Sequence, residues 1–173
     1  MLFVRVDLHY LSSQEASIDI STMMYHMQYL LSYISNKDSC FKDLQGYAWA
    51  IEQGEDRGYH CHLLLIYNGS VNQHDYYYGD EVGKKWQFVT NGMGSYFNCN
   101  TTDYKKKFRD EGTLGIGMIH RSNEVEVQNA LRVASYLVNP EKSNQTLLVK
   151  PINGWRTFGK GQFNVSWRRG ISS

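Results

Sequence analysis

Two stretches rich in β-forming residues, 47–53 and 59–67, are separated only by the sequence GEDRG at 54–58. A short connection that contains glycine typically joins consecutive antiparallel strands, so this part of the chain predicts a β-hairpin. If the connection is a five-residue loop, Gln53 faces Tyr59. This register then determines which side chains of the two strands share a face of the sheet.

The second strand of this hairpin contains two histidines, His60 and His62, inside the sequence GYHCHLLLIYNG. Residues two apart in a strand point to the same face. The register places Glu52 opposite His60 and Ala50 opposite His62, and directly opposed residues have Cβ atoms about 5 Å apart. Ala48 and Ala50 are small and are expected to leave space beside the histidines. One carboxylate and two imidazoles would form a divalent-metal site with open positions, which is typical of catalysis.

Another interpretation of the histidine pair is structural. Two histidines in a strand can be ordinary core residues that bond to the backbone, without any metal. In addition, a register shift of one residue would turn Glu52 to the opposite face. Glu55 and Asp56, in the connection between the strands, would then be the substitute carboxylates.

In four further segments the hydrophobic residues recur with the period of a strand or of a helix. These segments are an alternating strand at 2–9, a helix at 23–34, a strand at 114–120 and a helix at 124–138. Asp19 is a candidate cap for the first helix and Asn36 its expected end. Asn123 and Glu126 are expected to form a capping box at the start of the second, and Pro140 ends it.

Residues 68–112 are the least regular part of the chain. They contain a polar, tyrosine-rich segment at 74–80 that is expected to be a loop, a short helix at 81–89 and a basic stretch at 104–109. Hairpin-joined strands with intervening helices predict an α+β fold, with a central, mostly antiparallel sheet of about five strands and flanking helices. We expect a single domain over residues 1–173.

Composition narrows the classes of protein. The 173 residues are 42% hydrophobic and 20% charged, as in an ordinary globular domain. The net charge of +1 gives no overall attraction to nucleic acid, so any such binding must come from local basic clusters. Three distant cysteines without a CxxC pair favour neither a disulfide framework nor a cysteine zinc site, and they fit a reducing cytoplasm. The alternating start does not resemble a signal peptide, and no apolar run has membrane-spanning length, so no membrane partner is expected.

The helix at 124–138 has a polar edge that contains Asn129, Arg132 and Tyr136 at the spacing of neighbours. Its expected apolar stripe consists of Val127, Ala130, Leu131, Ala134, Leu137 and Val138. A tyrosine at such an edge can simply be a boundary residue with a hydrated hydroxyl. Beside a metal-bound phosphodiester, however, Tyr136 could be the nucleophile, and Arg132 could hold the phosphate.

The combination of GYHCHLLL with the later ALRVASYLVNP resembles the HUH-endonuclease superfamily of rolling-circle replication initiators. It is most similar to the inovirus replication-protein-like group, which includes the YagK/YfjJ C-terminal domain. The matching segments are the His-x-His motif at 60–62, GIGMIH at 115–120, ASYLVN at 134–139 and RTFGKGQF at 156–163. The chain departs from the family pattern at Asn139, where the family often has a lysine, and Lys142 is a candidate substitute.

This resemblance implies a fold, an activity and a set of site residues. The fold would be the RRM/palm-like HUH endonuclease fold, and the activity would be nicking and rejoining of single-stranded or hairpin origin DNA. Glu52, His60 and His62 would hold Mg²⁺ or Mn²⁺, and Tyr136 would form a 5′-phosphotyrosine intermediate. The chain has no GxxxxGK[ST] motif, so a host or separate helicase would be the partner.

Contacts to DNA are expected from two clusters that mix basic and aromatic residues, since cations meet phosphates and aromatic rings stack on bases. The first cluster has Lys105, Lys106, Lys107 and Arg109 with Tyr104 and Phe108, and the second has Arg156, Lys160, Arg168 and Arg169 with Trp155 and Trp167. The alternative for each cluster, a solvated surface, is the slightly favoured interpretation. Arg5 and Asp7, on the mixed face of the first strand, could border the site, but the favoured interpretation is that they take part in an ordinary cross-strand ion pair.

Two other functions fit the same residues. A metal-free DNA-binding regulator would keep the basic clusters without nicking DNA, and the departure at Asn139 leaves that function open. A zinc-dependent hydrolase would use a water-activating base and no covalent intermediate. A covalent protein–DNA adduct would distinguish the nicking enzyme from both.

Overall fold

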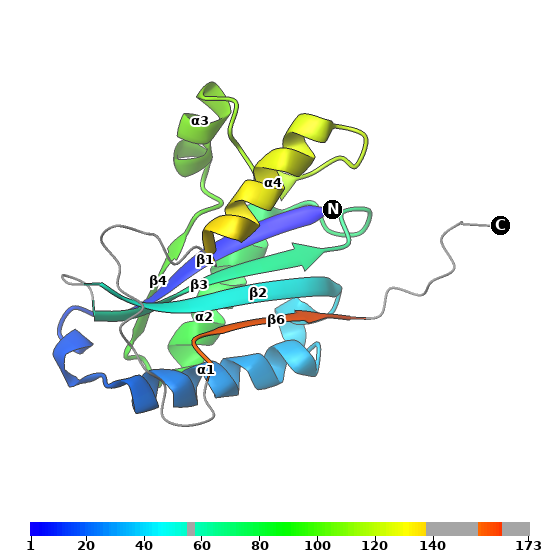
Figure 1. Ribbon diagram of the computed structural model, residues 1–173. Coiled ribbons are helices and arrows are strands. Elements are labelled where there is room, and N and C mark those ends of the chain that lie inside the picture. Colours follow the sequence, from blue (N-terminus) through cyan, green and yellow to red (C-terminus); the bar gives the residue numbers. More distant parts are fainter. Residues whose placement is uncertain (55–57, 138–155, 164–173) are drawn as a thin grey trace.

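The computed structural model describes residues 1–54, 58–137 and 156–163, and this part of the chain has an α+β fold. Six antiparallel strands form one sheet: β1 Leu2–Tyr10, β2 Leu44–Gly54, β3 Gly58–Tyr67, β4 Gly94–Asn98, β5 Gly117–Met118 and β6 Phe158–Gln162. The four α-helices are α1 Ile20–Ser35, α2 Asp75–Val89, α3 Thr102–Asp110 and α4 Glu124–Leu137. The strand order is β4-β1-β3-β2-β6, and β5 pairs with the remaining part of β1 (Figure 1).

The hairpin of β2 and β3 has the predicted register. Gln53 pairs with Tyr59, Glu52 with His60 and Ala50 with His62. Glu52 and both histidines therefore lie on the same face of the sheet.

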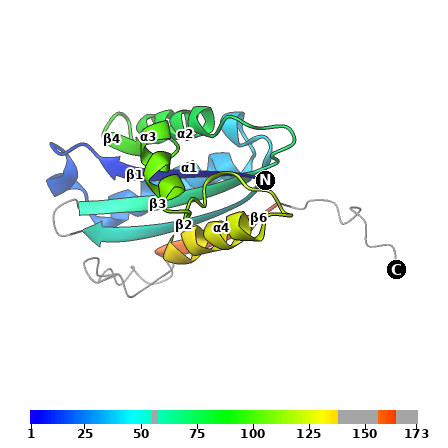
Figure 2. The ribbon, with the colours of Figure 1, turned by 90° about the horizontal axis from the view of Figure 1, so that it is seen from above.

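The sheet is covered on both faces (Figure 2). On one face, α1 and α2 pack against the alternating apolar residues of β1 and β3, which are fully buried and include Val4, Val6, Leu8, Leu63 and Leu65. On the other face, Ala130 and Leu137 of α4 pack against Phe3, Ala50 and Leu64. This second face also contains the histidine pair, so α4 and the histidines share one side of the sheet.

The predicted caps are confirmed at the first long helix and in part at the second. The Asp19 carboxylate accepts a hydrogen bond from the backbone of Thr22, and Asn36 is the C-cap of α1. Pro140, the expected end of the second helix, lies outside the described residues. The Asn123 side chain accepts a hydrogen bond from the Glu126 backbone, which is the first half of the predicted capping box. The second half differs, because the Glu126 carboxylate bonds to the Asn123 side chain and to the backbone N–H of His120.

The region 68–112 is more regular than the sequence predicts. The tyrosine-rich segment is helical from Asp75 and is not a loop, and the basic stretch lies in α3. Gly79 and Gly83 are buried inside α2, where the helix contacts β4. A Cβ at Gly83 would lie 2.2 Å from the Tyr96 ring, so glycine allows the close approach.

Two further expectations are wrong in detail. The strand expected at 114–120 is reduced to β5, which has two residues, because other groups already cover most of the free edge of β1. Between β4 and β5 the Asn100 side chain accepts a hydrogen bond from the Arg5 N–H and donates one to the Arg5 carbonyl. In α4, Leu131 is 53% exposed and does not belong to the apolar stripe.

Candidate metal centre

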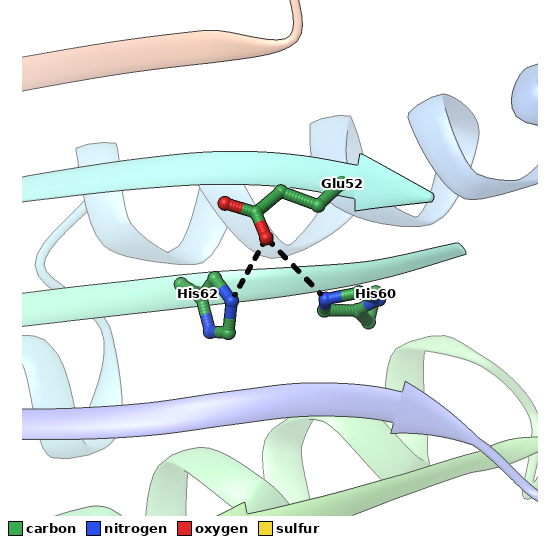
Figure 3. A group of neighbouring side chains, drawn as sticks. All are labelled: Glu52, His60 and His62. Carbon is green, nitrogen blue, oxygen red and sulfur yellow. Dashed lines mark ion pairs between the residues drawn. The ribbon is translucent and has the colours of Figure 1, made fainter. Parts of the chain in front are cut away.

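Glu52, His60 and His62 form one buried cluster (Figure 3). Glu52 Oε2 lies 3.6 Å from His60 Nε2 and 3.3 Å from His62 Nε2, and the three ligand atoms all lie within 4.8 Å of one another. Ligands bound about 2.1 Å from one ion, at angles of about 90° to 110°, lie roughly 3.0 to 3.4 Å apart. The group could therefore hold a metal ion with little rearrangement.

The hydrogen bonds of the two rings leave both Nε2 atoms available to a metal. His60 Nδ1 lies 3.3 Å from the Gly58 carbonyl oxygen and His62 Nδ1 lies 2.7 Å from Asp7 Oδ1, and both partners are acceptors. Each Nδ1 therefore carries the proton, and each Nε2 presents its lone pair to the cluster. His62 Nε2 is buried without a hydrogen-bond partner among the described residues, as expected for a ring nitrogen placed for a metal.

Asp7, on β1, orients His62 and is itself held by Arg5. The Arg5 guanidinium bonds to both carboxylate oxygens of Asp7 at 3.0 and 3.1 Å. Burial raises the pKa of Asp7, but its hydrogen bonds and charge interactions with His62 and Arg5 outweigh burial and keep the pKa well below its usual range. Burial lowers the pKa of His62, but the hydrogen bond to Asp7 and the nearby Glu52 carboxylate outweigh burial and raise it. Asp7 is therefore a carboxylate that fixes the tautomer of a metal-facing histidine.

Arg5 and Asp7 form an ion pair within β1 and not across strands as expected, and the cross-strand partner of Asp7 is His62. The contact of Asp7 with His62 could not be predicted from the sequence, because β1 and β3 pair across more than fifty residues of chain. A signal was nevertheless present in the alternation of β1, which places Arg5, Asp7 and His9 together on its mixed face. His9 stacks on His60 with ring centroids 5.5 Å apart.

The alanines beside the histidines have a different role from the expected one. Ala50 is 3% exposed and Ala48 is partly buried, and both pack in the apolar cluster beneath α4. Their small side chains therefore allow the close approach of the helix and do not leave open space.

Tyr136 lies near the last turn of α4 and is 46% exposed. The Arg5 guanidinium carbon is 5.7 Å from the centre of the Tyr136 ring, and Arg5 Nη2 is 3.3 Å from His62 Nδ1. One arginine thus contacts both the tyrosine and a histidine of the cluster. The predicted nucleophile and the predicted ligands are therefore connected through Arg5.

The other predicted DNA-binding residues have varied surroundings. Lys105 is paired with Asp75 at 2.5 Å and both are largely buried, whereas the exposed Lys106 is paired with Asp110. Arg132 bonds to the Asn129 side chain. The remaining described candidates are exposed, and they are Lys107, Arg109, Arg156 and Lys160. The candidates outside the described residues are Glu55, Asp56, Asn139, Lys142, Trp155, Trp167, Arg168 and Arg169.

Comparison with known proteins adds no family assignment. No family model matches the chain, and no curated protein matches it. Among the described residues, no helix is both long and apolar enough to span a membrane. The candidate function therefore depends on the geometry of the site.

Proposed function

We propose that the protein is a replication initiator endonuclease of the HUH type, which nicks and rejoins single-stranded or hairpin origin DNA. Tyr136 is the nucleophile, and Glu52, His60 and His62 hold one Mg²⁺ or Mn²⁺. The observation that carries the proposal is the position of Arg5, which contacts both the Tyr136 ring and His62. A metal cluster alone suits many reactions, but a tyrosine beside it is the arrangement required for a covalent phosphotyrosine.

The mechanism follows from these positions. A bound divalent ion would polarise the scissile phosphate and neutralise the charge that develops on it. The Tyr136 hydroxyl gives up its proton to solvent and Oη forms a bond to phosphorus. The bond from phosphorus to the 3′ oxygen breaks, and the 3′ oxygen takes up a proton, so the exchange is balanced. The products are a 5′-phosphotyrosine and a free 3′ hydroxyl, and attack by a 3′ hydroxyl on the phosphotyrosine rejoins the strand. Asp7 keeps His62 in the ligand tautomer, and Arg5 supplies positive charge beside the reacting groups.

The cellular setting is part of the same proposal. The three cysteines of the chain are all unpaired, which supports a reducing cytoplasm. The strand separation that replication needs would come from a host or separate helicase.

The test of the proposal is a covalent adduct. Purified protein is incubated with Mn²⁺ and labelled hairpin-bearing single strands, and the products are resolved under denaturing conditions. The parent protein is expected to form an adduct that protease removes, and Tyr136→Phe is expected to lose it completely because the nucleophilic oxygen is absent.

Tyr25→Phe is the matched control for this test. Tyr25 is 64% exposed on α1, which covers the opposite face of the sheet, so its substitution should leave the adduct unchanged. An adduct that persists in Tyr136→Phe would contradict the assignment. If the parent binds the strands but never forms an adduct, the non-catalytic DNA-binding regulator is the better function.

A further inference from the structure

Arg5 lines a hollow in which none of the lining residues is a metal ligand. The hollow has a volume of about 50 Å³ and is partly open to solvent. Its lining includes Tyr104 and Phe108 of α3, Leu114 and Ile116 of the following loop, and Val133 of α4. Figure 1 shows α3 and α4 next to each other, with the connecting segment between them.

We propose that this hollow binds one nucleobase of the DNA strand, next to the scissile phosphate. The inference rests on the proposed nicking function and adds a binding site for the substrate. Binding sites for drug-sized ligands start at about 300 Å³, so a hollow of about 50 Å³ does not enclose a ligand. It can take the edge of one flat ring that stacks on the aromatic side chains around it.

The chemistry of the lining favours a base over an aliphatic group. Tyr104 and Phe108 lie one helical turn apart with ring centroids separated by 5.1 Å. Phe97 on β4 extends this aromatic row, with its centroid 5.3 Å from that of Tyr104, and it is 46% exposed. Aromatic rings and the flat guanidinium of Arg5 provide faces on which a base can stack.

Position and charge also favour DNA. Phe97 pairs across the sheet with Asp7, the partner of His62, so the aromatic row begins beside the metal cluster. Lys107 and Arg109 are exposed on α3 and form no ion pair among the described residues. They can meet the phosphates of a strand whose base occupies the hollow.

The experiment compares two ligands that differ only in their bases. One is a 20-mer of thymidylate, and the other is a 20-mer of abasic deoxyribose phosphate with the same backbone charge. Binding is measured by fluorescence anisotropy at one fixed salt concentration, because phosphate contacts depend on salt. Phe108→Ala is expected to weaken binding of the thymidylate 20-mer by roughly 5- to 150-fold and to leave binding of the abasic 20-mer unchanged.

Two further variants serve as controls, one for the loss of apolar volume and one for substitution of an unrelated exposed phenylalanine. Phe108→Leu keeps apolar volume but removes the flat face, and it should also lose affinity for the thymidylate 20-mer alone. Phe88→Ala removes a 62% exposed phenylalanine from α2, on the other side of the sheet, and should change neither affinity.

The outcomes separate this proposal from the nicking function. If Phe108→Ala affects both ligands equally, or neither, the hollow does not bind a base, and adduct formation at Tyr136 can still stand. If the parent protein binds neither 20-mer, the base site is contradicted, and the adduct test with hairpin-bearing strands decides the nicking function separately. Selective loss for the base-containing ligand in both Phe108 variants supports the base site.

Discussion

At the scale of single residues, the tautomers of the two histidines decide whether the cluster can bind a metal. His60 donates its Nδ1 proton to a backbone carbonyl, a partner that mutation of side chains cannot remove. His62 donates to Asp7, which substitution can change. The two ligands therefore differ in how easily their orientation can be tested.

Asp7→Asn is expected to weaken Mn²⁺ binding by about 10- to 100-fold, the usual effect of removing a carboxylate that orients a metal-bound histidine. The amide is less basic than the carboxylate, and it also ends the ion pair with Arg5. Isothermal titration calorimetry with Mn²⁺ measures the effect. Asp80→Asn is the control, since Asp80 bonds to Lys84 and Tyr96 away from the cluster. Equal affinities for the parent and Asp7→Asn would show that Asp7 does not support the site.

At the scale of elements, short-range features were predictable from the sequence and long-range ones were not. The β2–β3 hairpin, and with it Glu52, His60 and His62, follows from strand periods and a short connection. Neither β4 nor the neighbour of β1 could be assigned, because strand order depends on tertiary packing. The start of α2 was missed because Gly79 is a poor helix former in isolation, whereas here it allows contact with Asn98. The role of Asp7 could not be predicted either, because it depends on the pairing of β1 with β3, which is distant in the sequence.

The position of α4 depends on the loop that precedes it. A Cβ added to Gly115 would lie 2.3 Å from the Asn129 backbone oxygen, so Gly115→Ala must push the helix away. The metal ligands lie on other elements and should be unaffected. We expect adduct formation to fall at least tenfold, because misplacement by about 1 Å can cost about 100-fold in rate, while Mn²⁺ affinity stays within about twofold.

Gly112→Ala is a useful comparison for Gly115→Ala. A Cβ at Gly112 meets no atom within 4 Å, although its positive φ of 69° makes any substitution strained. If the two variants lose activity equally, local backbone strain and not the position of α4 is responsible. Loss of Mn²⁺ binding in Gly115→Ala would likewise contradict the explanation, because it would mean that the whole face is disturbed.

At the scale of the whole molecule, metal binding should contribute to stability. A ligand present at 100 times its dissociation constant adds about 2.7 kcal/mol to the free energy of unfolding. For a chain of this size, each kcal/mol raises Tm by about 2 to 4 °C, so saturating Mn²⁺ should raise Tm by about 5 to 10 °C. His62→Gln should abolish the shift, whereas His74→Gln, at an exposed histidine outside the cluster, should retain it. A shift that survives His62→Gln would place the ion elsewhere.

The proximity of the ligands in the sequence has a consequence for the order of assembly. Glu52, His60 and His62 come from one hairpin, and Asp7 precedes it, whereas Tyr136 follows much later in the chain. Hairpins close within microseconds, and residues emerge from the ribosome at only about 5 to 20 per second. The cluster of Glu52, His60 and His62 can therefore form on the nascent chain seconds before Tyr136 is synthesised. The reactive group would then join a site that is already complete.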